Sequence, residues 1–121
     1  MIRVLDSNEA GGADEVALVC DIFKDGGSLM KVLDFEHRPE QSQMAESVVD
    51  ALRNGEHLLV EAGTGVGKSL AYLIPSIIHA KKNKRPCVVA TNTINLQEQL
   101  LEKDIPAVRQ VFESEEKYHP F

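Results

Sequence analysis

The stretch Glu61-Ala62-Gly63-Thr64-Gly65-Val66-Gly67-Lys68-Ser69 indicates the fold, because an apolar run leads into it and a helical apolar pattern follows it. Its glycines allow a tight turn whose backbone N–H groups approach phosphate oxygens without Cβ clashes. Lys68 adds a full positive charge for the β- and γ-phosphates, and the Ser69 hydroxyl can ligate Mg²⁺. The sequence therefore predicts a phosphate-binding loop.

The spacing of this loop follows Gly-x-x-x-x-Gly-Lys-Ser/Thr with one departure, Ala62 in place of the first glycine. Residues 57–60 before the loop are an apolar run of the buried-strand type, and apolar residues recur at helical spacing over residues 70–78 after it. Strand, loop and helix thus come in the order that phosphate binding requires. A glycine-rich turn that binds nothing is the alternative, but it does not explain Lys68 and Ser69 at the helix start.

Composition describes an ordinary globular chain of 121 residues, one domain or a piece of one. The net charge of −6 argues against a generally basic nucleic-acid binder but leaves room for a local basic groove. Cys20 and Cys87 lie far apart without metal-ligand spacing, which favours free thiols in a reducing compartment. The apolar stretches are shorter than a membrane span, so we expect a cytoplasmic protein without membrane association.

The order of elements predicts an α/β fold with a parallel sheet. Residues 14–23 have helical spacing, residues 28–35 look extended, and a helix should begin at Pro39 and end at Asn54-Gly55. The helix after Lys68 should pass through Pro75, and residues 86–90 form a second strand-like run. Strand–helix–strand units of this kind have parallel strands.

Gln41 stands near the start of the helix that precedes the loop. Its amide offers both a donor and an acceptor, which is what recognition of an adenine edge requires. The plainer interpretation is a solvated glutamine on a helix surface.

The segment Thr91-Asn92-Thr93 follows the second apolar run, at the edge where open α/β sheets bind ligands. A polar loop that only caps the next helix is the equally weighted alternative. In that helix Asn95 and Glu98 resemble a capping box, and Ile105-Pro106 should break it. The basic residues at 81–85 suit the C-terminal end of the preceding helix, with a nucleic-acid patch as the minority interpretation.

Together these residues resemble the DinG-like, XPD-related branch of superfamily 2 DNA helicases. The resemblance covers about residues 35 to 108 and lies in Glu36–Gln41, His57–Pro75 and Ala90–Leu100. An alanine at the position of Ala62 is usual in that family.

The resemblance implies a partial RecA-like P-loop domain that binds ATP and Mg²⁺ and, in a full-length enzyme, moves along single-stranded DNA. It implies that Gln41 contacts the base, that residues from Ala62 to Ser69 bind phosphate and the metal ion, and that Thr91 to Thr93 contact the DNA backbone. Residues 35–112 would then be the N-terminal part of the motor domain. Residues 1–34 would be an extension or linker remnant, and residues 113–121 a tail.

Several parts of such a helicase are not found in these 121 residues. They include an Asp-Glu-x-His motif, four cysteines for an iron–sulfur cluster and a second motor domain with an arginine finger. We therefore expect an ATP-binding portion that is not catalytically complete alone, and a short sheet that leaves the chain prone to self-association. A small-molecule P-loop kinase and a non-catalytic nucleotide-dependent interaction module are the alternatives.

Overall fold

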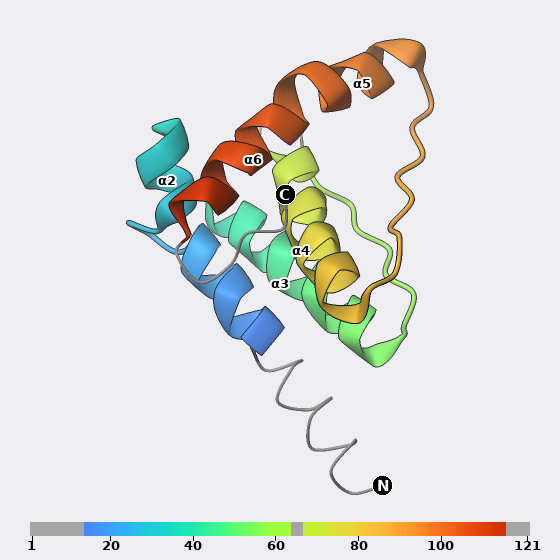
Figure 1. The fold of residues 1–121 in the computed structure, drawn as a ribbon, viewed down its shortest axis with the longest axis horizontal. Coiled ribbons are helices and arrows are strands. Elements are labelled where there is room, and N and C mark those ends of the chain that lie inside the picture. Colours follow the sequence, from blue (N-terminus) through green and yellow to red (C-terminus); the bar gives the residue numbers. More distant parts are fainter. Residues whose placement is uncertain (1–13, 64–66, 116–121) are drawn as a thin grey trace, which may run out of the picture.

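The computed structural model describes residues 14–63 and 67–115 of the chain. Figure 1 shows a helical body with two long connections on one side of it. The elements in order are a helix over residues 14–23, α2 (Ser28–Leu33), α3 (Pro39–Asn54), α4 (Lys68–Asn83), α5 (Ile94–Gln99), the π-helical η1 (Leu100–Asp104) and α6 (Ile105–Ser114).

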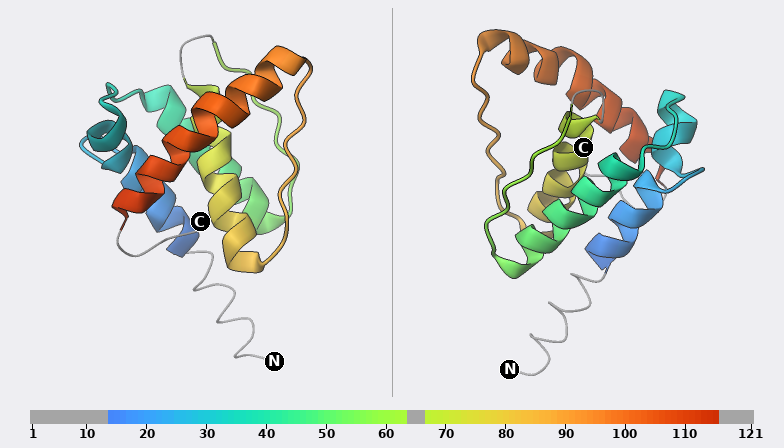
Figure 2. Two further views of the ribbon diagram at one scale, coloured as in Figure 1. Left: turned by 45° about the horizontal axis from the view of Figure 1, so that its top comes forward. Right: turned by 180° about the vertical axis from the view of Figure 1, so that it is seen from behind.

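The core lies where α3 and α4 pack side by side and α6 crosses them. The pair α3 and α4 makes the most extensive contact between elements, and α6 also contacts α2 and α4. Figure 2 shows α6 lying across this pair from two further directions. The fully buried apolar side chains are Val19, Ile22, Ala45, Val49, Ala71, Ile74, Val108, Val111 and Phe112.

Three of the predicted helices are confirmed. Residues 14–23 are helical, α3 begins with Pro39 at its first position, and α4 continues through Pro75. Gly55 ends α3 in the left-handed conformation with φ of 66°, where its N–H bonds back to the carbonyls of the last turn. A residue without a Cβ meets no steric penalty in that conformation, so the helix ends at Asn54-Gly55 as predicted.

The predicted α/β fold with a parallel sheet is wrong. Residues 56–63, the first connection, and residues 85–91, the second connection, contain no strand, and no other described residue lies in one. Leu59 is 99% exposed and Val88 is 88% exposed. A strand gains stability from ladder hydrogen bonds and from burial of its side chains by neighbours, and an apolar run supplies neither by itself.

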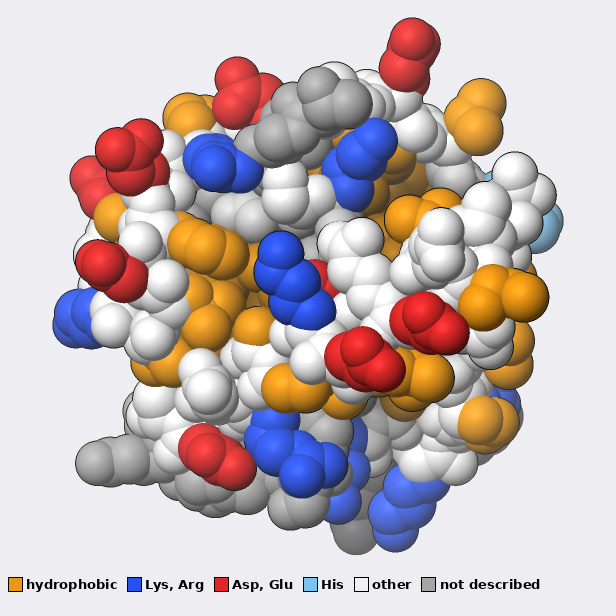
Figure 3. Space-filling model, turned by 90° about the horizontal axis from the view of Figure 1, so that it is seen from above, with side chains coloured by type: hydrophobic (Ala, Val, Ile, Leu, Met, Phe, Trp, Pro, Cys, Tyr) orange, Lys and Arg blue, Asp and Glu red, His pale blue; other side chains and the backbone are white. Residues whose placement is uncertain are grey.

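Exposed apolar side chains are also found on the helices that follow the second connection. Ile94 and Leu96 of α5 and Leu101 of η1 are exposed. Figure 3, seen from above, shows hydrophobic side chains at the surface between charged ones. The helical core therefore leaves a substantial apolar surface uncovered.

The predicted extended segment over residues 28–35 is also wrong in its first part, because Ser28–Leu33 forms α2. The helix is only six residues long, which is too short for a periodic apolar pattern to show. Tertiary packing supports it instead: Leu29 is buried, and α2 packs on α6. Short helices gain most of their stability from such contacts rather than from propensity.

The predicted break at Ile105-Pro106 does not occur, because η1 widens the helix just before the proline. The N–H of Ile105 bonds to the carbonyl of Leu100, five residues back. Pro106, the second residue of α6, has no N–H to donate, and the wider π-helical turn just before it accommodates the proline without ending the helix. The π-helical segment lets α5, η1 and α6 continue as one rod, as Figure 1 shows.

The exposed connections give a first prediction. The double substitution Leu59→Ser/Val88→Ser should change the free energy of unfolding by less than about 0.5 kcal/mol, because both side chains are already in water. Ile74→Ala, a control in the core, should cost about 2 to 5 kcal/mol. Urea unfolding followed by circular dichroism measures both. A cost above about 2 kcal/mol for the double variant would contradict the exposed connections.

Candidate functional site

The two long helices meet at the loop that the sequence singled out. Gly67 precedes α4 with φ of 76°, a left-handed conformation that a side chain would strain. A Cβ added there would also overlap the side-chain amide of Gln41. Two features therefore favour glycine at position 67: its left-handed backbone conformation and the close approach of the Gln41 side chain from α3.

Gln41 is the residue that makes this approach. Its side-chain Nε2 donates a hydrogen bond to the carbonyl oxygen of Gly67 at 3.2 Å, and the residue is only 4% exposed. The interpretation of Gln41 as a solvated surface glutamine is thus wrong. The predicted contact with a nucleotide base stays a prediction, but the amide already joins the start of α3 to the start of α4.

Lys68, the first residue of α4, bonds back to the residue before Gly63. Its Nζ donates to the carbonyl oxygen of Ala62 at 3.3 Å, and its side chain is exposed. The predicted phosphate ligands Thr64, Gly65 and Val66 lie between these two residues and outside the described part of the chain. Among the described residues, the ammonium group of Lys68 therefore bonds to a neutral carbonyl.

The donor set at this place fits an anionic phosphate group with a metal ion. A Cβ at Gly63 would meet nothing within 4 Å, so the backbone before the loop is open. Ser69 is half-buried in the first turn of the 16-residue α4. A lysine ammonium and the positive end of a helix dipole favour a bound phosphate, and a hydroxyl oxygen can ligate Mg²⁺.

Thr91, Asn92 and Thr93 form a small turn of their own. The Thr93 hydroxyl accepts from the N–H of Leu96 at 3.1 Å and caps α5, while the Thr91 hydroxyl donates to the carbonyl of Thr93 at 3.2 Å. Thr93 therefore caps α5, and the predicted contact of this turn with the DNA backbone stays a prediction. The predicted capping box at Asn95 is wrong, because Asn95 lies inside α5, two residues after the true cap.

The loop and this turn lie toward the same edge of the molecule. In Figure 1 both connections run upward from the lower ends of α3 and α4. The end of the first connection and the turn that follows the second therefore both lie toward the upper side of this view. Two hydrogen bonds flank the loop, one from Gln41 to Gly67 and one from Lys68 to Ala62. The side-chain bonds of Thr91 and Thr93 stay within their turn and the start of α5.

A polar cluster that the sequence did not reveal holds α4 from its other end. Glu15 is 3% exposed, and its oxygens lie 3.1 Å from Nδ1 of His79 and 3.2 Å from Nδ2 of Asn83. Asn83 also donates to the carbonyl oxygen of His79 at 2.8 Å. The helix over residues 14–23 is thereby fixed to α4. The sequence shows only that His79 and Asn83 are four residues apart, and this spacing does not identify Glu15 as their partner.

The two cysteines are both free thiols. Burial and the neighbouring Glu46 carboxylate raise the pKa of Cys20, whose Sγ lies 3.6 Å from Glu46 Oε1. A raised pKa keeps the thiol protonated and unreactive at neutral pH. The described residues also contain no group of three or more His, Cys, Asp and Glu side chains that could hold a metal ion.

Comparison with known families gives the assignment. The model of the DEAD/DEAH box helicases matches residues 38–113, which include Gln41, the loop and the turn at Thr91–Thr93. The chain belongs to this family. The matched residues contain nearly all of the segments on which the resemblance to DinG-like helicases rested, and that prediction is confirmed.

Three relatives illustrate the similarity. The ATP-dependent helicase DinG of Mycobacterium tuberculosis (strain H37Rv) is 55% identical over 69 residues, which are 57% of this chain and 10% of that protein. The 3'-5' exonuclease DinG of Bacillus subtilis (strain 168) is 45% identical over 78 residues, 64% of this chain and 8% of that protein. The ATP-dependent DNA helicase YoaA of Haemophilus influenzae is 39% identical over 92 residues, 75% of this chain and 14% of that protein.

This DEAD/DEAH box chain spans about a tenth of the length of the curated relatives that it matches. No solved structure matches it. Among the described residues, no helix is both long and apolar enough to cross a membrane.

The buried amide gives the second prediction. Gln41→Ala should lower the free energy of unfolding by about 1 to 3 kcal/mol, because it removes a nearly buried hydrogen bond and leaves the Gly67 carbonyl without it. Gln43→Ala, on the exposed side of the same helix, is the matched control and should cost less than about 0.5 kcal/mol. Equal unfolding midpoints for the two variants in urea would show that the Gln41 amide does not hold the loop.

Proposed function

We propose that this chain is the ATP-binding portion of an ATP-dependent DNA helicase, in which ATP hydrolysis by the full enzyme drives movement along single-stranded DNA. The observation that carries the proposal is the bonded set at the start of α4. Gln41 reaches the Gly67 carbonyl, and Lys68 reaches across the loop to Ala62. The family match over residues 38–113 and the names of the relatives support the same activity.

In this proposal the loop from Ala62 to Ser69 holds the triphosphate. Backbone N–H groups of the glycine-rich turn would hold the phosphates. Lys68 would bond to the β- and γ-phosphates in place of the Ala62 carbonyl, and the Ser69 hydroxyl would ligate Mg²⁺. The bound metal ion neutralises phosphate charge. Exchanging a neutral carbonyl for an anionic phosphate gives a stronger, charge-assisted hydrogen bond.

Gln41 is proposed to recognise the adenine base. Its amide lies next to Gly67, so a nucleotide held by the loop would place its base on the α3 side. An amide can donate to one adenine atom and accept from another. In Gln41→Ala, competition between ATP and GTP distinguishes the two roles of this residue: loss of the ATP preference indicates base recognition, and an equal loss for both nucleotides indicates support of the loop alone.

The turn at Thr91–Thr93 is proposed to contact the DNA backbone. Asn92 and Thr93 are exposed, and hydroxyl and amide groups donate to phosphate oxygens without reading sequence. The cap uses the Thr93 hydroxyl oxygen as an acceptor, which leaves its hydrogen available to a phosphate.

The exposed apolar side chains of the two connections favour self-association of the isolated chain. Sedimentation velocity over a concentration range compares the parent with Leu59→Ser/Val88→Ser. A parent that stays monomeric at high concentration would refute self-association.

Lys68→Ala is the third prediction and the main test of the proposed function. The variant should lose most binding of Mg-nucleotide, because a charge-assisted contact worth about 1.5 to 3 kcal/mol disappears, roughly a 10- to 150-fold loss in affinity. Its unfolding should change little, because Lys68 is exposed. Titration with a fluorescent ATP analogue in the presence of Mg²⁺ measures the affinity.

Lys31→Ala, at an exposed position on α2, is the control and should bind as the parent does. Equal affinity of Lys68→Ala and the parent would refute the phosphate-binding loop. ATP turnover by the purified chain, measured in parallel, should be absent, because the sequence offers no Asp-Glu-x-His motif to orient water and no arginine finger.

The fourth prediction separates DNA contact from capping at Thr93. Thr91→Ala/Thr93→Asp should keep the cap, because aspartate caps helices as well as threonine does, but it should weaken binding of single-stranded DNA, because a carboxylate repels phosphate. Thr91→Ala/Thr93→Ser is the matched control: it also lacks the Thr91 hydroxyl but keeps the capping hydroxyl at position 93, so only the carboxylate distinguishes the two variants. Fluorescence anisotropy with a labelled oligonucleotide, alongside urea unfolding, measures the two effects. Equal DNA affinity of both variants would leave capping as the only role.

A further inference from the structure

The positive charge of the chain is concentrated in one stretch. Residues 62–97 contain five Lys and Arg and no Asp or Glu, whereas the rest of the chain has eight Lys and Arg against 19 Asp and Glu. One of the five is Lys68 in the loop, and the other four are Lys81, Lys82, Lys84 and Arg85. The chain is acidic overall but carries a strongly basic end on α4, and anion binding follows such local distributions rather than net charge.

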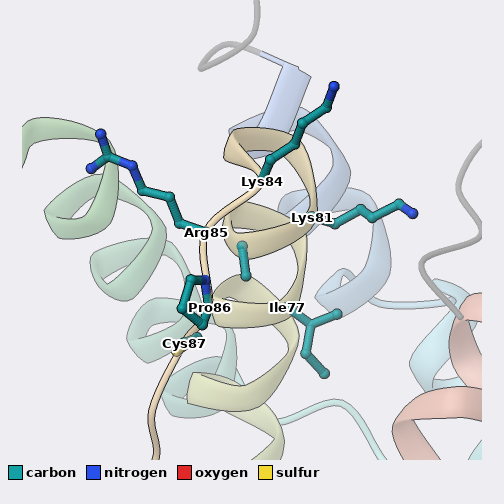
Figure 4. A pocket seen from close by; sticks show the side chains of 7 residues that line it. Ile77, Lys81, Lys84, Arg85, Pro86 and Cys87 are labelled. Carbon is teal, nitrogen blue, oxygen red and sulfur yellow. The ribbon is translucent and has the colours of Figure 1, made fainter.

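Three of these five cations, Lys81, Lys84 and Arg85, line an open cavity at the end of α4. Its volume is about 540 Å³, and its walls combine the cationic Lys81, Lys84 and Arg85 with the apolar Ile77 and Pro86. Figure 4 shows that the three charged side chains point away from one another, Arg85 to one side of the helix and Lys81 and Lys84 to the other. They therefore do not converge on a single point.

The three cations have no acidic partner among the described residues, whereas their neighbour Lys82 pairs with Asp14 at 3.5 Å. One or two positive charges suffice to complement the C-terminal end of a helix dipole, and the effect ends within the last turn. Arg85 lies beyond the end of α4, and Lys84 is its cap. The dipole alone thus does not account for this cluster.

We propose that the cavity formed by Lys81, Lys84 and Arg85 binds the phosphate backbone of single-stranded nucleic acid as a second contact, separate from the loop at Lys68 and the turn at Thr91–Thr93. Diverging cations match the spaced charges of an extended polyanion, whereas one free phosphate needs converging donors. The apolar walls of Ile77 and Pro86 offer contact to a sugar or a base. The site lies about 20 Å from Lys68, the length of most of a 16-residue helix.

The test measures binding of a labelled oligothymidylate of about 20 nucleotides, longer than one such site, to the full chain without nucleotide. The variant Lys81→Gln/Lys84→Asn/Arg85→Gln removes the three charges, and asparagine tolerates the left-handed φ of 52° at position 84. We expect at least about a tenfold loss of affinity at low salt. The slope of log affinity against log salt should fall by about 2, because each lost phosphate contact removes about 0.7 from the slope.

Lys82→Gln is the matched control, since it removes one charge from the same helix end at a position already paired with Asp14. It should change the salt slope by less than about 0.5. If the triple variant fails to fold, Lys81→Gln and Arg85→Gln singly should each lower the slope by about 0.7.

Four results would overturn the proposal. The first three are an unchanged salt slope in the cavity variants, a loss of equal size in Lys82→Gln, and tighter binding of polyglutamate than of the oligothymidylate. The fourth is displacement of the oligonucleotide from the Lys68→Ala variant by micromolar inorganic phosphate, because that result indicates a site for a single phosphate group. Lys68→Ala retains this cavity, so failure of nucleotide binding and failure of this site are observed separately.

Discussion

The hydrogen bond from Gln41 to the Gly67 carbonyl is the constraint on which the candidate site depends. It joins the first turn of α3 to the residue before α4, and these two helices share the largest interface in the described fold. Because Gly67 has no Cβ, the amide can approach the backbone closely enough to bond. The loop is therefore held at its C-terminal side by packing and by one buried polar contact, next to the exposed Lys68.

The opposite end of α4 is held by different chemistry. Glu15 lies buried between the helix over residues 14–23 and α4, where His79 and Asn83 both come within hydrogen-bond distance. Ser42 adds a bond from α3 to the carbonyl of Phe23 at 2.9 Å. A helix that precedes the family-matched residues thus braces both helices of the site. Buried polar groups of this kind fix relative position because an unpaired partner would be costly.

Helices were predictable from this sequence where apolar periodicity and end signals agreed, as for Pro39–Asn54 between its proline and Gly55. The short helix Ser28–Leu33 could not be predicted, because six residues are too few to show an apolar periodicity. Its stability comes from contact with α6. The prediction of a parallel sheet was wrong for a related reason. Apolar runs such as 57–60 indicate which side chains would suit a buried strand, but only neighbouring strands supply the ladder, and the described residues supply none. Gln41 and Lys68 were found from motif chemistry, whereas Glu15 matches no motif.

The two anion sites argued for this chain lie at opposite ends of α4, and the helix dipole treats them differently. At the start, the partial positive charge adds to Lys68 and favours a compact polyphosphate. At the C-terminal end of α4, the partial negative charge opposes anion binding, so positive side chains must first offset it. Lys82 contributes one such charge, but it is also paired with Asp14. Binding there requires the further charges of Lys81, Lys84 and Arg85, whose side chains point away from one another and do not converge on a single phosphate. The same helix would then bind a nucleotide at one end and a strand at the other, and its rigid length keeps the two about 20 Å apart.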